Sequence, residues 1–493
     1  MTKSKWNGSR WSWALAGYAA AIVSSLVAGA ARADEPAEDP LANLVVTPDA
    51  AARPLPKVAL IPSLAFNLED VTLRSVVQRD LELSGEFEVL PDGAAPPGDY
   101  SSSAKVDVKA WAAKGAEALV RVAGRSAGTD QVELFAEAYL VEAGDDAVFT
   151  KTWLVPASRV RAESHYVADQ LLKALTGTEG GFFSHLTFVA GSGSLRRVYR
   201  VDADGFDAKP ISPPEHVALA PAYGPQGELY WAGSVDKDEY KIYRATKPDE
   251  PVKLNLKGSV YGLAWSRDHA KVAVSLGQGS AIKLFVGPSL EQLAEASPVK
   301  SALRPGFTPS GLVAFAGEGK YGQRVYVDGK AITPEGVFAS APTFCKHPDG
   351  IRTVFAAGVG KSSDLVSTGE KGGGLVRLTQ GQGSNAYPAC SPDGRLVAFF
   401  STRKSGEGPG LYVMRVDGGR PKRVSTLQGD SLRWDRLPPT KSKEASKPAA
   451  QVAPGPAPAG PAPAGPAPAA PAQPAIDPAK LRETGKAIRD SVR

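Results

Sequence analysis

A short apolar strand, a polar turn and a second apolar strand recur along the middle of the chain. The clearest copy lies between Ala389 and Phe399, where Pro392, Asp393 and Gly394 suit a tight turn before a run of β-formers. Five such turns are anchored at Gly224, Ser266, Thr308, His347 and Ser391. Their spacings of 42, 42, 39 and 44 residues are typical of four-stranded propeller blades. The pattern therefore predicts one blade for each copy.

The two ends of this repeat region are incomplete in complementary ways. Residues 431–438 indicate an inner strand, with Trp434 in the position that Trp265 holds in its own copy, and nothing blade-like follows. Residues 186–212 contain three strand-like runs with no inner strand ahead of them. Because a repeat array cannot bury its end faces alone, the two fragments are expected to complete one blade. The sequence thus predicts a six-bladed β-propeller over residues 184–438, closed by a split blade.

Ahead of the propeller, residues 57–183 show strands that alternate with helices. Residues 58–61 form an apolar strand, and apolar residues then recur at helical spacing from Leu73 to Leu81. A last helical stripe is expected over residues 164–176, ending at Gly177. This segment is long enough to own a core. The predicted fold class is therefore mainly β, with a smaller α/β domain preceding the propeller.

Residues 1–33 have the features of an export signal. Basic residues precede an apolar run from Trp13 to Ala30, and Ala31 and Ala33 frame an A-x-A cleavage site. The run is close to membrane-spanning length, so an uncleaved anchor is the alternative. No later segment holds the roughly 18 consecutive apolar residues that a span requires, so no membrane span is expected after cleavage.

Residues 34–56 are expected to be a flexible amino-terminal segment because they are acidic and contain proline. Within them, residues 41–47 are β-prone. A free extended segment of this kind can add to the edge of a sheet. The alternative is a plain leader without a role.

The charge and the two cysteines add to this picture. The formal net charge of +5 falls to about +1 without the four basic residues of 1–33, so nucleic-acid binding has no electrostatic support. Cys345 and Cys390 lie in matching strands of adjacent predicted blades, shifted by one residue in register. This shift would turn their side chains to opposite faces and favours two buried free thiols, although an oxidising compartment permits a disulfide.

Beyond the propeller, residues 439–475 are rich in proline, alanine and glycine and are predicted to be a semi-extended linker. Residues 476–493 could form a short amphipathic helix, with Asp477 as its cap and a thin stripe that includes Leu481 and Ile488. A docking helix and a solvated, mostly disordered tail both remain open.

The motifs for catalysis or cofactor binding that we considered are absent or incomplete in the sequence. No Gly-x-Ser-x-Gly elbow occurs, and the phosphate-loop-like residues 358–362 lack the required first glycine. Residues 202–205 hint at calcium but lack the first and last acidic ligands of the loop, so a strand-connecting turn is favoured. The five histidines show no pair at ligand spacing, so zinc has no support. No catalytic residue, cofactor or metal is expected.

Two segments of the α/β region resemble a known family. Residues 110–120, AWAAKGAEALV, and residues 165–180, HYVADQLLKALTGTEG, look like motifs of the amino-terminal domain of TolB proteins. The predicted six-bladed ring follows in the same order. The resemblance covers roughly residues 57–438 and leaves out the carboxy-terminal tail. It implies a periplasmic scaffold of the Tol-Pal system, which supports envelope integrity and constriction at division.

The resemblance also implies two partner sites. The peptidoglycan-associated lipoprotein Pal would dock on the propeller mouth, over the loops that lead into the inner strands. The implied contact residues are Ser259, Val260, Tyr261, Gly262, Leu303, Arg304, Asn385 and Tyr387. The inner-membrane protein TolA would bind the extended segment through Leu41, Leu44, Val45 and Val46, and this segment's arrangement is coupled to Pal binding in the family. A histidine expected at position 259 is absent, which weakens the residue-level transfer.

A second hypothesis comes from another class of protein. Propellers also host catalysis and ligand binding at their mouths, so a hydrolase or a glycan-binding protein of the cell envelope is the alternative. Carboxylates that converge at the mouth would favour it.

Overall fold

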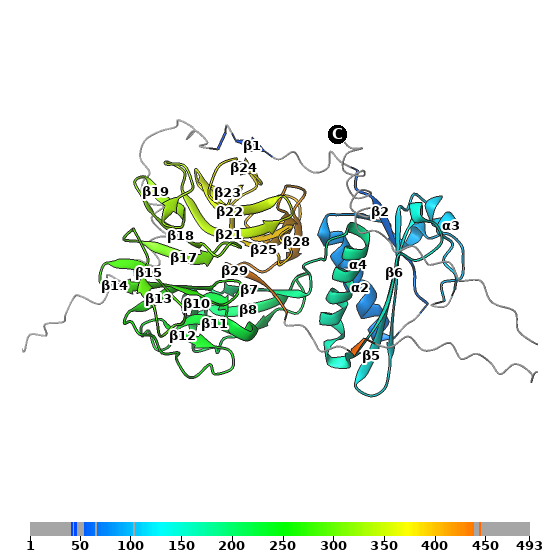
Figure 1. Cartoon of the computed structure of the whole chain (residues 1–493), viewed down its shortest axis with the longest axis horizontal. Helices are drawn as coiled ribbons and strands as arrows, with labels where there is room; N and C mark the ends of the chain where they lie inside the picture. The colour runs from blue at the N-terminus through cyan, green and yellow to red at the C-terminus, as the bar shows by residue number, and fades with distance from the viewer. Residues whose placement is uncertain are drawn as a thin grey trace, which may run out of the picture.

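The structure, a computed structural model, describes residues 41–42, 44–46, 54–64, 67–101, 104–437 and 443–444. An α/β domain lies beside a ring of six β-sheets (Figure 1). The predicted fold class is confirmed. The predicted export signal, the terminal helix and nearly all of the predicted linker lie outside the described residues.

The α/β domain is built on one sheet with the strand order β3-β2-β4-β5-β6-β30. Strands β3, β2 and β4 are parallel, and the others pair antiparallel. The strands are β2 (Lys57–Leu60), β3 (Glu88–Val89), β4 (Ala118–Ser126), β5 (Gln131–Leu140), β6 (Phe149–Pro156) and β30 (Lys443–Glu444). Helices α2 (Leu68–Ser84) and α4 (Val160–Thr176) pack on one face of this sheet. Helix α3 (Val108–Ala112) packs through Trp111 against the other face, which Ala59 and Leu119 line.

The propeller consists of six sheets whose strands follow one another outward from the channel. Its first blade pairs β29 (Asp430–Arg436) with β7 (Ser184–Ala190), β8 (Arg197–Asp202) and β9 (Lys209–Pro210). The second and third blades are β10 (Val217–Tyr223), β11 (Leu229–Ser234) and β12 (Lys241–Arg244), then β13 (Ser259–Trp265), β14 (Val272–Gln278), β15 (Ala281–Gly287) and β16 (Ala294–Glu295). The fourth blade is β17 (Ala302–Phe307), β18 (Val313–Gly319), β19 (Gly322–Val327) and β20 (Lys330–Ala331). The fifth blade is β21 (Ala339–His347), β22 (Gly350–Val359), β23 (Ser362–Gly369) and β24 (Val376–Arg377), and the sixth is β25 (Asn385–Cys390), β26 (Leu396–Ser401), β27 (Gly410–Arg415) and β28 (Lys422–Ser425).

The ring closes through the first blade, as the sequence predicts. Strand β29 pairs antiparallel with β7, and Trp434 lies opposite Leu186. The indole Nε1 of Trp434 donates to the Ser184 hydroxyl at 2.7 Å, so the closing strand is held by a side chain as well as by its ladder. The inner strand β29 also contacts β25 and β10, its neighbours on either side.

In five of the six blades, one of the recurring polar turns connects the inner strand to the next strand of the blade. In the sixth blade, the Ser391 amide donates to the Leu396 carbonyl at 2.9 Å, and Gly394 has a φ of +79°. A Cβ on Gly394 would lie 2.2 Å from the Lys346 carbonyl oxygen, so both the backbone conformation and the neighbouring blade require glycine.

Part of the amino-terminal segment lies on the outer edge of the fifth blade. Strand β1 (Val45–Val46) pairs parallel with β24, the last strand of that blade. Leu41 is 2% exposed and packs in a cluster that includes Val325 and Phe355. Edge addition, one of the two alternatives for this segment, is therefore the arrangement observed for Val45 and Val46.

The first residues past the propeller return to the α/β domain. Strand β30 pairs antiparallel with β6, with Lys443 opposite Leu154 and Glu444 opposite Trp153. These residues belong to the predicted linker, and no strand is predicted there, because a two-residue strand has no periodicity of its own.

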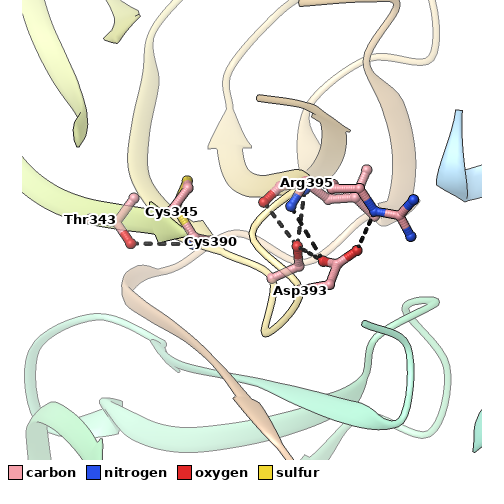
Figure 2. The surroundings of a disulfide bond; sticks show 7 residues. Thr343, Cys345, Cys390, Asp393 and Arg395 are labelled. Atoms are coloured by element: carbon pink, nitrogen blue, oxygen red, sulfur yellow. Dashed lines mark hydrogen bonds and ion pairs between the residues drawn. A yellow bond between two sulfur atoms is a disulfide. The ribbon is translucent and has the colours of Figure 1, made fainter. Parts of the chain in front are cut away.

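Cys345 and Cys390 form a disulfide, which corrects the preference for free thiols (Figure 2). Their Cα atoms are 5.2 Å apart, within the usual range for disulfides. The one-residue shift does not keep the two sulfur atoms apart, because the cysteines lie in different sheets. Strands β21 and β25 belong to neighbouring blades that pack face to face, so side chains on opposite faces of the two sheets point into the same space.

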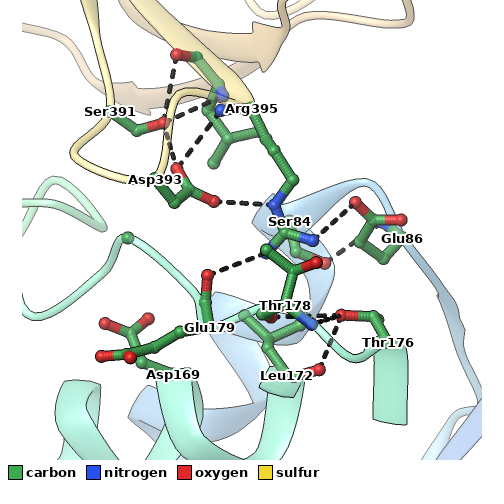
Figure 3. A network of polar contacts seen from close by, with 12 residues as sticks. Ser84, Glu86, Asp169, Leu172, Thr176, Thr178, Glu179, Ser391, Asp393 and Arg395 are labelled. Carbon is green, nitrogen blue, oxygen red and sulfur yellow. Dashed lines mark hydrogen bonds and ion pairs between the residues drawn. The ribbon is translucent and has the colours of Figure 1, made fainter. Parts of the chain in front are cut away.

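The α/β domain contacts the propeller through polar groups. Arg395, beside the turn of the sixth blade, pairs with Asp393 at 2.8 Å and with Glu86 of the α/β domain at 3.2 Å (Figure 3). Arg415 pairs with the same Glu86 at 2.7 Å. Asp169 of α4 accepts the amides of Phe182 and Phe183, where the chain enters the propeller. Helices α2 and α4 thus face the propeller.

No helix within the described residues has the length and apolar character needed to cross a membrane.

Candidate functional site at the mouth of the propeller

The six inner strands share one irregularity near their first residues. Each of β10, β13, β17, β21, β25 and β29 changes register against the next strand of its blade. These bulges lie at the end of the ring where the inner strands begin, which we call the mouth. The turn of the sixth blade at the opposite end contacts the α/β domain, so this domain leaves the mouth uncovered. Bulges often re-aim side chains beside functional sites.

The bulges have a common backbone conformation. Residues with a positive φ occur at five of them, and these are Ala220, Arg304, Ala341, Tyr387 and Ser431. Four of the five are followed by proline, namely Pro221, Pro305, Pro342 and Pro388. Proline has no N–H for a ladder, which is why it is tolerated at a bulge. Left-handed backbone at non-glycine residues costs energy and concentrates at functional sites, so this shared conformation marks the mouth as a candidate functional surface.

Two arginines extend from the bulges toward the channel. Arg433 of β29 donates to main-chain carbonyls of three other blades, those of Pro221 at 3.3 Å and of Leu263 and Pro305 at 3.5 Å. Burial lowers the pKa of Arg433 to about 10, and the charge of Arg304 acts in the same direction. The Arg304 guanidinium lies 4.5 Å from the centre of the Tyr387 ring and donates to Ser431 at 3.4 Å.

A cavity of about 220 Å³ occupies the channel, and all six inner strands contribute to its lining. Arg433 and Trp434 line it, as do Tyr223, Trp265 and Phe344. Its lining includes one carboxylate, that of Asp435, whose pKa is raised by burial. The cavity is therefore lined mostly by aromatic and small residues, with an arginine and a single acid, and the surface that they present is more polar than apolar.

The structure brings the predicted Pal-contact residues to the mouth, but not all to its surface. Ser259, Tyr261, Leu303, Arg304 and Tyr387 keep partial exposure. Val260, Gly262 and Asn385 are buried. A Cβ on Gly262 would lie 2.4 Å from the Pro305 ring, so Gly262 allows the inner strand of the third blade to approach that of the fourth. These three residues belong to the packed layer beneath the surface of the mouth.

Asn385 connects the mouth to the edge where β1 lies. Its amide Nδ2 lies 3.4 Å from Asp364 Oδ1 and 3.2 Å from the Thr379 hydroxyl. Asp364 in turn pairs with Arg377 of β24, and Arg377 lies opposite Val46 of β1 in the ladder. A continuous buried network therefore connects the mouth with the edge of β24, the two predicted partner sites. Sequence could not reveal it, because its members are polar residues spread over three strands.

A second polar cluster lies between the two domains. His165 of α4 has Nδ1 2.7 Å from Asp80 of α2, and its Nε2 is 3.9 Å from carboxylate oxygens of Asp202 and Asp204. Burial opposes charge on His165, but the Asp80 carboxylate outweighs it and raises the pKa of His165 to about 9.

This cluster bears on the expected absence of a metal. His165, Asp202 and Asp204 have the spacing of metal ligands, which the scattered histidines did not indicate. Arg161 already donates to both carboxylates, however, so a cationic group occupies the place where a metal would bind. Asp202 ends β8 and residues 203–205 follow it in a turn, as predicted. Asp202 and Asp204 pair with Arg161 of α4, so the propeller contacts α4 at this turn.

Sequence reasoning missed Arg433 as a site residue. A signal was present, because proline stands three residues before the anchors at 224, 308 and 391. These recurring prolines lie at the bulges of the inner strands. Arg433 itself could be found only by aligning Trp434 with Trp265 and asking which neighbour faces the channel.

The fold and the site define a class: a six-bladed propeller with an uncovered, rigid mouth, preceded by an α/β domain that contacts its other end. Residues 55–143 match the family described as the TolB amino-terminal domain. The chain is 32% identical over 173 residues to the Tol-Pal system protein TolB of Syntrophotalea carbinolica, a match that covers 34% of this chain and 38% of that protein's length. The predicted resemblance to the TolB family is confirmed.

Solved structures support the fold. The crystal structure of TolB from Acinetobacter baumannii superposes with a TM-score of 0.64 at 21% identity, covering 78% of this chain and 97% of that one. A putative TolB from Agrobacterium tumefaciens gives a TM-score of 0.39 at 17% identity, covering 49% and 87% of the two chains, and carries no argument here.

Proposed function

We propose that this protein is a periplasmic protein-binding scaffold of the Tol-Pal system rather than a catalyst. The proposal rests on the mouth, where six bulged inner strands place partly exposed residues on one rigid rim that the α/β domain leaves uncovered. A Pal-like lipoprotein would bind there and link the outer membrane and peptidoglycan to the inner-membrane Tol proteins. The similarity to TolB proteins supports this choice of partner.

The second partner site is the amino-terminal segment. Leu41 is buried against the propeller and β1 occupies the edge of β24, so a TolA-like protein would gain these residues only when the segment leaves that edge. Two partners that favour different placements of one segment are thermodynamically coupled. The network from Arg377 to Asn385 offers a physical connection between this edge and the mouth.

The proposed function is tested by the affinity for the Pal-like lipoprotein of the same cell. Tyr261→Asp places a charge in the contact and should weaken binding by at least about tenfold. Val148→Asp is the matched control, because it adds the same charge to an exposed residue of the α/β domain. Equal affinity for both variants would reject the mouth assignment.

Coupling is tested separately by deleting residues 34–53. The dissociation constant for the Pal-like lipoprotein should change, because the deletion removes one of the two states of the edge of β24. An unchanged constant would reject the coupling and leave the docking site intact.

The hydrolase alternative gains no support from the cavity. A glycoside hydrolase needs two carboxyl groups across its substrate, whereas the lining of this cavity supplies Asp435 alone. Turnover of envelope glycans by the purified protein would reverse this preference.

A further inference from the structure

The charge of Arg433 has no acidic partner in the channel. The guanidinium is satisfied only by three main-chain carbonyls, at distances of 3.3 to 3.5 Å. Among the described residues, no ion pair joins it to a carboxylate. Asp435 lines the same cavity, but its electrostatic neighbours are His269 and Arg267. Arg433 keeps partial exposure to the channel. Charges that are largely removed from water are normally paired in proteins, so an anion at this point of the channel would complete the arrangement.

A second cation stands on the mouth side of Arg433. Arg304 is stacked on Tyr387 and donates to the Ser431 hydroxyl, which donates to Asp430 at 2.8 Å. Asp430 is already paired with Arg196 at 2.8 Å. Arg196 and Arg304 therefore share the carboxylate of Asp430, Arg304 through Ser431. Burial lowers the pKa of Arg433, and the charge of Arg304 lowers it further.

The rim around Arg304 continues this positive character. Exposed lysines stand in the loops that connect the second and third strands of three consecutive blades, namely Lys320, Lys361 and Lys404. One exposed acid, Glu318, precedes Lys320 in the first of these hairpins. The acidic residues of the corresponding loop in the second blade, Asp236, Asp238 and Glu239, lie on another sector. Glu407, in the same loop as Lys404, accepts the Arg423 amide at 2.8 Å. An anionic group that approaches the mouth is thus drawn toward the fourth to sixth blades.

We propose that the mouth is a carboxylate-binding site, in which Arg304 and Arg433 take one aspartate or glutamate side chain that a docked protein inserts toward the channel. The carbonyl contacts use Nε and Nη2 of Arg433, so the carboxylate would accept from Nη1 of Arg433 and from the guanidinium of Arg304. The three carbonyls hold the Arg433 fork across the channel, so little side-chain entropy remains to be lost on binding. The inference rests on the proposed function, because the docked protein supplies the carboxylate. A free anion such as phosphate is the other source of the same chemistry.

The first experiment measures the site without a protein partner. Thermal unfolding of the mature protein is followed in sodium acetate and in sodium chloride of equal concentration. Acetate should raise the unfolding midpoint of the wild type, because a ligand that binds only the folded state stabilises it. Arg433→Gln and Arg304→Gln should lose the difference between the two salts. Arg420→Gln should keep it, because this exposed arginine lies in the β27–β28 turn at the other end of the ring.

Thermal unfolding in sodium phosphate distinguishes a site for a free anion from a site for a protein carboxylate. If sodium phosphate raises the midpoint of the wild type and acetate does not, the site takes a free anion and the inference is overturned. If acetate and chloride give the same midpoint for every variant, there is no carboxylate site.

The second experiment uses the Pal-like lipoprotein of the same cell. Arg433→Gln should weaken its binding by about 30-fold or more, because removing one member of a desolvated charge pair leaves the other unpaired. Arg433→Lys keeps the charge without the fork and should fall between this variant and the wild type. Arg420→Gln should bind as the wild type does.

The outcomes distinguish the inference from the proposed function. Wild-type affinity in both Arg433→Gln and Arg304→Gln, with binding lost in Tyr261→Asp, overturns the carboxylate site and keeps the docking surface. No binding by the wild type overturns the proposed function. If Arg433→Gln fails to fold, Arg304→Gln decides, because Arg304 is partly exposed and its removal leaves the carbonyl contacts of Arg433 in place.

Discussion

The guanidinium of Arg377 lies 2.6 Å from the carboxylate of Asp364, and both side chains are almost completely buried in the fifth blade. Arg377 belongs to the strand on which β1 lies, and Asp364 also accepts from Thr379 at 3.0 Å. Asn385 of the mouth reaches the same carboxylate. One charge pair therefore stands between the amino-terminal segment and the mouth.

Removing one member of this pair should destabilise the protein strongly. Asp364→Asn leaves the Arg377 guanidinium buried with a neutral partner and is expected to lower the free energy of unfolding by about 3–5 kcal/mol. Lys247→Met is the control, because Lys247 and Glu250 form an ion pair with exposed fractions of 55% and 71%. Its effect should stay within roughly 1 kcal/mol. Denaturant unfolding of both variants makes the comparison, and equal effects would show that the buried pair is not required.

The disulfide should contribute to the stability of the ring. Cys345 and Cys390 are 45 residues apart, and closing a loop of that length in the unfolded chain is worth roughly 4 kcal/mol in the chain-entropy account. The Cys345→Ala, Cys390→Ala double variant should therefore unfold at a lower temperature than the wild type. A thiol reductant should lower the wild-type midpoint and leave that of the double variant unchanged. A wild-type midpoint that ignores the reductant would argue against the bond.

The repeat pattern predicted the fold because the same sequence of strand, polar turn and strand recurs from blade to blade. Turns that combine proline, aspartate and glycine with an apolar run occur at a fixed period, and the unmatched strand at Trp434 required a partner at Leu186. Element ends were less predictable. Helix α4 begins at Val160, one turn before the expected start, because the 3₁₀ turn Ala157–Arg159 leads into it without a side-chain cap.

The candidate site was only partly predictable. The loops at the mouth followed from the alignment of inner strands, but the burial of Val260 and Asn385 depends on the packing of neighbouring blades. The disulfide depends on which faces of two sheets meet, and the unpaired charge of Arg433 depends on carbonyls from three blades. These are relations between sheets, and a period along the chain carries no information about them.

Ring closure depends on Trp434, and a graded series should show it. Trp434→Ala removes a large side chain that is 8% exposed and should cost about 3–5 kcal/mol. Trp434→Phe retains most of the volume but loses the bond to Ser184, so its cost should be nearer 1 kcal/mol. Leu195→Ala is the control, because Leu195 is 73% exposed. Denaturant unfolding gives the three values, and a Trp434→Ala effect no larger than that of Leu195→Ala would contradict closure through this strand.

The cluster around His165 should make stability depend on pH. The groups that face it are Asp80 from α2, Asp202 and Asp204 from the turn after β8, and Arg161 from α4. The pKa of His165 is about 9 in the folded protein, above its ordinary value of 6.5, so the bound proton stabilises the folded state. This contribution is complete below pH 6.5 and is lost as the pH rises through about 9. The thermal unfolding midpoint should therefore fall across that window.

His165→Gln isolates this contribution, because glutamine keeps a hydrogen-bond donor and does not titrate. Burial also raises the pKa of Asp80, which contacts His165, to about 7 and that of Asp169 to about 8, and both give a fall in the same direction. The quantity to compare is therefore the slope of the wild type minus that of the variant. This difference should be negative between pH 6.5 and 9. His347→Gln should show no such difference, because burial lowers the pKa of His347 and its proton is already lost in this window. Parallel profiles for the wild type and His165→Gln would mean that His165 joins the two domains as a neutral ring.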